Sequence, residues 1–176
     1  MIIIVDNGKG ADEIARMIRM NNKIVKPSAF GPASAYILSD GDMKNQKLNE
    51  KIIKKVDVPV LGIGCGSMSI ASAFGAEIKK VPRVECQERV MIRKPCPLTL
   101  DMKRMFSVHE NYQNVIENLP ENFGVIANSR QCEFEIIQEM QSPFFGVQFN
   151  PEKGLDGMTI LRNFERFVEV WEKYHK

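Results

Sequence analysis

The stretch that decides the fold is residues 59–74, PVLGIGCGSMSIASAF. Its first five residues are mostly apolar, which predicts a buried strand, and residues 68–74 are small and apolar, which predicts a helix packed closely on a sheet. A sharp strand-to-helix turn with small residues two positions on either side of its apex is typical of a nucleophile elbow. Gly62 and Gly66 occupy the flanking positions, so the apex falls on Gly64, which has no side chain.

Buried strands alternate with helical patterns through the first half of the chain. Continuous apolar runs predict strands over residues 2–5 and 35–38, with a shorter strand over 23–26, and apolar spacing predicts helices over 11–20 and 48–56. This alternation predicts an α/β fold with a parallel sheet covered on both faces, whose binding site lies at the carboxyl ends of the strands. Three polar segments fall at such ends, namely residues 6–8 (DNG), 39–41 (SDG) and 64–66 (GCG).

The second half of the chain has a different pattern. Three prolines interrupt residues 78–106, which predicts loops and short strands there, with antiparallel pairing as an option. Further strands are predicted over residues 123–127, 134–138 and 144–149, followed by an amphipathic helix at the C-terminal end. The length of 176 residues favours one domain, residues 1–176.

Composition excludes several classes of function. The net charge of +2, without a long basic run, argues against a nucleic-acid or membrane-surface partner. The four cysteines form no Cys-x-x-Cys pair, so we expect no structural zinc. The apolar start stops at Asp6, far short of a membrane span, and free thiols suit a reducing compartment. We therefore expect a cytoplasmic protein.

Four segments together resemble the class I glutamine amidotransferase family. Residues 61–78 are similar to the nucleophile segment LGICLGHQ and the helix after it, 39–42 (SDGD) to the oxyanion turn SGGP, 119–129 (LPENFGVIANS) to LPEGF…LA.S, and 146–152 (GVQFNPE) to GVQFHPE. In length and ends the chain most resembles the small glutaminase subunit of archaeal two-subunit GMP synthetase. The resemblance implies a three-layer, flavodoxin-like domain with a mostly parallel central sheet and a small antiparallel portion.

The same resemblance implies a degenerate catalytic triad. The family's cysteine falls on Gly64, its histidine on Asn150 and its acid on Glu152, while the glutamine of the substrate pocket falls on Met68. In the oxyanion turn, Asp40 replaces the first glycine and Gly41 keeps the second, which supplies a backbone N–H. An asparagine cannot accept a proton near neutral pH, so the carried-over site lacks both nucleophile and base.

Two functions remain open, and a third alternative is an enzyme with a different chemistry at the same site. The first is a silent binding or regulatory module for a synthetase subunit, or for a small molecule held in the old glutamine pocket by residues Gly41, Gly66, Ser67 and Met68. The second is an active glutaminase that uses Cys65 as a shifted nucleophile and supplies ammonia to a partner synthetase. His109 is a candidate substitute base, although a surface role suits it better, and the glycine turn is a candidate anion cradle. The resemblance implies no cofactor and no metal.

Overall fold

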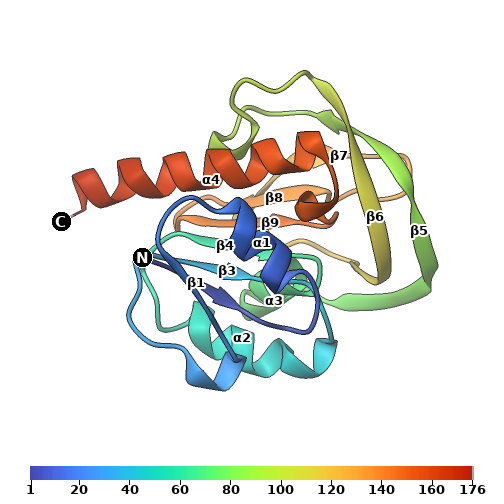
Figure 1. The fold of residues 1–176 in the computed structure, drawn as a ribbon. Coiled ribbons are helices and arrows are strands. Elements are labelled where there is room, and N and C mark those ends of the chain that lie inside the picture. Colours follow the sequence, from blue (N-terminus) through green and yellow to red (C-terminus); the bar gives the residue numbers. More distant parts are fainter. Residues whose placement is uncertain (176) are drawn as a thin grey trace.

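A nine-stranded mixed sheet forms the centre of the protein in the computed structural model, which describes residues 1–175 (Figure 1). The strand order is β2-β1-β3-β4-β9-β8-β7-β5-β6. The parallel part contains β1 (Ile2–Val5), β2 (Asn22–Val25), β3 (Ala35–Leu38), β4 (Val60–Ile63) and β9 (Phe144–Val147). The antiparallel part continues through β8 (Ile136–Glu139), β7 (Phe123–Asn128), β5 (Ile78–Ile92) and β6 (Met105–Ile116).

Helices cover both faces of the parallel part, so the predicted three-layer α/β architecture is confirmed (Figure 1). One face carries α1 (Ala11–Met17) and the long helix α4 (Leu155–Tyr174), and the other carries α2 (Gln46–Ile53) and α3 (Cys65–Ala73). The central strands supply both cores by alternation: Ile2 and Ile4 pack with one cluster, while Ile3 and Val5 pack with the other. Continuous apolar runs are therefore required, because neither face of these strands meets water.

The prediction of short strands is wrong for residues 78–92, whereas the antiparallel pairing offered as an option for this segment is confirmed. Most of this segment is the 15-residue strand β5, paired along its length with the 12-residue strand β6, which the sequence pattern did not reveal. Pro82 is accommodated because it lies at the register shift between Lys80 and Val84, where the ladder needs no N–H donor. Pro95 and Pro97 come after the strand has ended.

Smaller differences concern element ends. Helix α3 begins at Cys65 instead of the predicted residue 68, and α1 ends at Met17 instead of residue 20. The early start of α3 matters for the site, because it places the backbone N–H of Cys65 at the helix N-terminus, directly after the turn at Gly64.

Candidate functional site

The turn between β4 and α3 depends on a glycine with a left-handed backbone. Gly64 has φ +53° and ψ −113°, a conformation that residues with side chains rarely adopt. Its N–H donates to the carbonyl oxygen of Val147 on the neighbouring strand β9, at 2.8 Å. Gly64 therefore sits at the carboxyl edge of the parallel sheet, where binding sites of such sheets occur.

The flanking glycines allow α3 to lie directly on the sheet. A Cβ atom on Gly62 would lie 2.5 Å from the Gly66 backbone, and one on Gly66 would lie 2.2 Å from the carbonyl oxygen of Leu38. Ser67 is fully buried and faces Gly146, where an added Cβ would lie 2.2 Å from the Ser67 Oγ. Gly66 and Ser67 thus pack against strands of the sheet.

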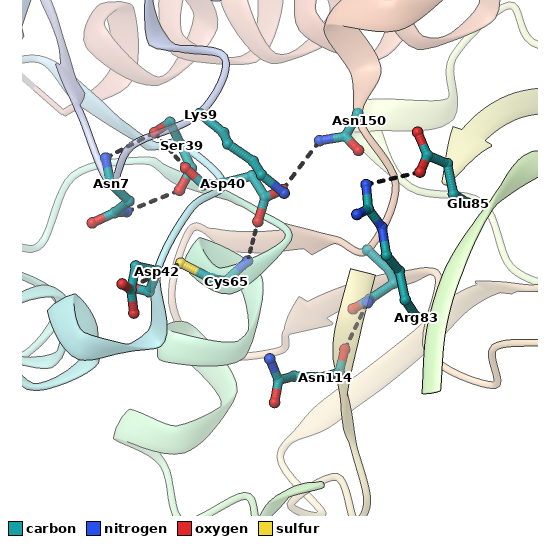
Figure 2. A network of polar contacts seen from close by, with 11 residues as sticks. Asn7, Lys9, Ser39, Asp40, Asp42, Cys65, Arg83, Glu85, Asn114 and Asn150 are labelled. Atoms are coloured by element: carbon teal, nitrogen blue, oxygen red, sulfur yellow. Dashed lines mark hydrogen bonds and ion pairs between the residues drawn. The ribbon is translucent and has the colours of Figure 1, made fainter. Parts of the chain in front are cut away.

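The carboxylate of Asp40 occupies the place where an apex side chain would stand. Figure 2 shows this carboxylate between Cys65 and Asn150, with the Lys9 side chain beside it. A Cβ atom built on Gly64 would lie 2.3 Å from Asp40 Oδ1. That oxygen accepts a hydrogen bond from the Cys65 N–H at 3.0 Å, and Oδ2 accepts one from Asn150 Nδ2 at 3.4 Å. Lys9 Nζ lies 3.8 Å from the same Oδ2. The buried carboxylate is thus held by a helix N-terminus, an amide and an ammonium group.

Neighbouring loops hold the Asp40 segment in position. The Asn7 N–H donates to Ser39 Oγ and the Asn7 side-chain amide donates to the Ser39 carbonyl oxygen, both at 2.9 Å. Gly41 has φ +154°, and a Cβ on it would lie 1.9 Å from the Asn7 carbonyl oxygen, so only glycine fits. The buried Asn49 side chain donates to Asn7 Oδ1 at 3.1 Å. Asp40 is therefore placed by a fixed polar network.

Cys65 carries a buried, protonated thiol. The residue is 2% exposed, and Sγ lies 3.8 Å from the carbonyl oxygen of Asp42. Burial, followed by the negative charges of Asp40 and Asp42, raises the pKa of this thiol to about 12. The opposing effects, from Lys9 and the Gly41 N–H, are weaker. Because the thiolate is the reactive form of cysteine, this environment does not activate Cys65.

Asn150 joins Asp40 to the strand that carries His109. Its backbone N–H donates to the His109 carbonyl oxygen at 3.0 Å, while its side chain donates to Asp40. The His109 imidazole has a different neighbour, since its Nδ1 lies 3.5 Å from Gln87 Nε2 on β5. Asn150 is thus hydrogen-bonded to the backbone of His109 and not to its imidazole ring.

Glu152 is a buried acid without a cationic hydrogen-bond partner. It lies in a short 3₁₀ turn, Pro151–Lys153, and its Oε2 atom has no hydrogen-bond partner in the part of the chain that the structure describes. Burial raises the pKa of this carboxyl to about 7, and Asp40 contributes in the same direction. A Cβ on Gly10 would lie 2.7 Å from Glu152 Oε1, so this side chain packs against the loop before α1.

A cavity of about 260 Å³ opens beside this network. The β5–β6 ribbon, defined as residues 78–116, forms one wall, and the carboxyl edge of the parallel sheet forms the other. Its lining residues are Lys9, Asp40, Gly41, Cys65, Met68, Arg83 and residues 111–114. Of the four residues expected to bind a ligand, Gly41 and Met68 line this cavity, whereas Gly66 and Ser67 do not.

Lys9 and Arg83 are site residues that the sequence analysis missed. Lys9 comes from the loop after β1 and Arg83 from the ribbon, where it pairs with Glu85 at 2.8 Å (Figure 2). Lys9 directly follows the polar segment 6–8 at the end of the first predicted strand, and this place in the sequence was the only indication that it could belong to the site. Within residues 1–175, no group of three His, Cys, Asp or Glu side chains could hold a metal ion, and no helix is long and apolar enough to cross a membrane.

Fold and site together define a class of protein: a three-layer α/β domain with a strand–turn–helix site at the carboxyl edge of its sheet. Comparison with known proteins narrows this class to a family. The family model for glutamine amidotransferase class-I matches residues 3–167. The chain therefore belongs to the class I glutamine amidotransferase family, as its motif segments predicted.

Individual relatives point to one branch of the family. The A subunit of the glutamine-hydrolyzing GMP synthase of Pyrococcus abyssi is 30% identical over an alignment of 183 positions. The alignment covers 94% of this chain and 97% of the relative. The corresponding subunit of Methanocaldococcus jannaschii is 31% identical, with coverages of 93% and 95%. A crystal structure of a candidate A subunit of GMP synthase from Thermoplasma acidophilum has a TM-score of 0.90 at 25% identity, over 98% of this chain and 95% of that one.

Proposed function

We propose that this glutamine amidotransferase, which is of the type of the GMP synthase A subunits, does not hydrolyse glutamine and acts as a binding subunit for a synthetase partner. One observation carries the proposal: the Asp40 carboxylate lies where the side chain of an apex nucleophile would stand. The free thiols of all four cysteines suit the cytoplasmic location that we also propose.

The geometry opposes each requirement of amide hydrolysis through an acyl-enzyme. Such a reaction needs a nucleophile, a base and donors for the oxyanion. Gly64 offers no nucleophile, and Asn150 cannot accept a proton near neutral pH. In a nucleophile elbow, the N–H after the apex stabilises the oxyanion. Here that group, the Cys65 N–H, already donates to Asp40, whose negative charge would repel a developing oxyanion.

The alternative, a glutaminase that uses Cys65, has less support. The residue is 2% exposed, the pKa of its thiol is raised to about 12, and two carboxylates are the largest charges acting on it. The groups that shift its pKa include no histidine. A thiolate at this position would thus need a large rearrangement around Asp40 and Asp42.

The direct test is glutamate release from glutamine, measured with and without the synthetase subunit encoded in the same genome. The Pyrococcus abyssi relative, assayed with its own synthetase, serves as the positive control. We expect no release above the level of a Cys65→Ser variant. Turnover that is abolished by Cys65→Ser would establish the alternative and refute the silent subunit.

A rescue experiment tests the role of Asp40 separately. Gly64→Cys with Asn150→His restores a thiol and an imidazole but leaves the Asp40 carboxylate in the way. We expect a glutamine-analogue electrophile to label the introduced thiol only after Asp40→Gly is added. Equal labelling of the double and triple variants would show that Asp40 does not block the apex.

The cavity beside Met68 is the candidate ligand site of this subunit. Its volume of about 260 Å³ is large enough for a small molecule beside the Asp40 carboxylate. Gly41, Lys9 and Arg83 line it, which favours a polar ligand. We place any small-molecule ligand of the silent subunit there.

A further inference from the structure

Positive charge is concentrated at one corner of the molecule. The basic corner, defined as residues 88–104 together with Arg130, contains six basic and two acidic side chains. The whole chain contains 24 basic and 22 acidic residues, so the remainder carries 18 basic and 20 acidic ones. A chain with a net charge of only +2 thus combines a basic corner with a slightly acidic remainder, which favours oriented electrostatic attraction.

Three arginines surround one hollow in this corner. The hollow has a volume of about 490 Å³, and Arg89, Arg93 and Arg130 line it. Arg89 lies near the end of β5, Arg93 directly follows the last residue of that strand, and Arg130 comes from the loop after β7. Glu88 also lines the hollow, and its carboxylate accepts the Arg89 N–H at 2.7 Å. Among residues 1–175, no carboxylate lies within ion-pair distance of any of the three guanidinium groups.

The hollow is partly preorganised by hydrogen bonds within this chain. Arg93 Nε donates to Asn128 Oδ1 at 2.8 Å, which orients the guanidinium and leaves its terminal amino groups free. Ser129 Oγ accepts hydrogen bonds from the N–H groups of Gln131 and Cys132, at 3.2 and 3.0 Å, and so shapes the loop that carries Arg130. Ordering the Arg93 side chain on binding therefore costs less entropy than ordering a free side chain.

Two methionines give the hollow the composition of a protein interface. Met91 and Met105 line it beside the arginines, and Met105 is 37% exposed. Arginine and methionine are enriched at protein interfaces, and methionine adapts its shape to a partner. A small phosphate ligand would use the guanidinium groups but leave the methionines uncovered. An acidic protein surface would use both.

We propose that this Arg–Met hollow is the surface on which the synthetase partner docks, with carboxylates of an acidic patch on that partner bound by Arg89, Arg93 and Arg130. The inference rests on the proposed binding function. Guanidinium groups bind carboxylates in a bidentate manner, and arginines that become desolvated this way are frequent hot spots of binding.

The test measures binding of the full-length chain to the synthetase subunit of the same genome by isothermal titration calorimetry. The variant is Arg89→Glu/Arg93→Glu/Arg130→Glu. Its matched control is Lys47→Glu/Lys51→Glu/Lys54→Glu, which makes the same change in net charge at exposed lysines of α2 and of its C-cap position. Circular dichroism confirms that both variants are folded. We expect the arginine variant to weaken binding more than about tenfold and the lysine variant to have a much smaller effect.

The outcomes separate this inference from the proposed function. Equal losses for both variants would indicate general charge attraction and overturn the docking surface, as would no loss for the arginine variant. No binding by the wild type would instead overturn the proposed binding function, and the docking surface with it. Glutamate release by the wild type would refute the silent subunit. Glutamate release would not contradict the docking surface if the arginine variant still binds more weakly than the lysine variant.

Discussion

At the residue scale, Asp40 and Gly64 form a coupled pair. The Asp40 carboxylate is where it is because Gly64 has no side chain, and Gly64 tolerates its left-handed backbone for the same reason. A substitution at either position therefore changes what the other one does. A side chain introduced at position 64 alone would therefore meet the Asp40 carboxylate.

This coupling predicts a non-additive effect on stability. We expect Gly64→Cys to destabilise the protein by about 2–4 kcal/mol, through overlap with Asp40 and backbone strain together. Adding Asp40→Gly removes the overlap but not the strain, so it should recover about 1–3 kcal/mol. Urea denaturation of both single variants and the double variant measures this energy. Gly31→Ala is the control, because nothing lies within 4 Å of the added Cβ and its φ is not positive. Strictly additive losses would contradict the coupling.

At the element scale, two buried acids lie where the β5–β6 ribbon meets the rest of the sheet. Glu110 on β6 and Glu135, just before β8, are both fully buried, and none of their four carboxyl oxygens has a hydrogen-bond partner of good geometry among residues 1–175. Burial raises the pKa of both groups, and for Glu135 the charge of Glu110 adds to the effect. Besides the two acids themselves, the side chains that act on these pKa values are Glu88, whose charge raises both, and Ser129, whose hydroxyl lowers that of Glu135.

These raised pKa values predict that the protein loses stability as pH rises. An acid whose pKa is higher in the folded than in the unfolded state binds more protons when folded, so its favourable contribution is complete below the ordinary glutamate pKa. That contribution is lost as the pH rises through the folded-state values. We expect Glu135→Gln to raise the free energy of unfolding at pH 9 relative to wild type and to flatten its dependence on pH. Urea denaturation between pH 5 and pH 9 provides the measurement.

Glu139 supplies a matched control for this prediction. It is buried like Glu135, but its carboxylate accepts hydrogen bonds from Asn122 Nδ2 at 2.8 Å, from the Gln141 N–H at 2.9 Å and from the Ser142 N–H. Glu139→Gln replaces an acceptor by a donor there and should destabilise by about 1–3 kcal/mol. A similar effect of both substitutions at pH 9 would show that the pair of acids does not control the pH dependence.

At the scale of the whole molecule, one sheet joins two hydrophobic cores. Phe164 on α4 belongs to the core on one face and Ile70 on α3 to the core on the other, and both are fully buried. Because the same strands contribute side chains to both cores, we expect the two faces to unfold together.

Phe164→Ala and Ile70→Ala test this expectation. Each should lower the free energy of unfolding, by about 3–5 and 2–5 kcal/mol respectively, while the protein keeps a single transition. Far-UV circular dichroism reports the whole molecule, and fluorescence of Trp171, the single tryptophan, reports α4. Transitions of an Ile70→Ala variant that no longer coincide by the two probes would mean that the faces unfold separately.

The strands that are predictable from the sequence are those whose burial requires a continuous apolar run. The buried strands over residues 2–5 and 35–38 are confirmed at those bounds, because a strand covered on both faces must be apolar throughout. The full length of β5 was not predicted because charged and polar residues occupy nearly half of its positions, which weakens the apolar signal, and because Pro82 resembles a break. Only pairing with β6 shows that this proline lies at a register shift.

The sequence by itself determined the α/β fold, the family, and the absence of a side chain at position 64 and of an imidazole at position 150. Tertiary structure alone decided which groups lie at these two positions. The Asp40 carboxylate reaches the apex because folding brings it to the Cys65 N–H, 25 residues away, and to Asn150, 110 residues away. A hydrogen bond between groups so distant in the chain leaves no periodic or local trace in the sequence, since only the packing of the strands sets their separation.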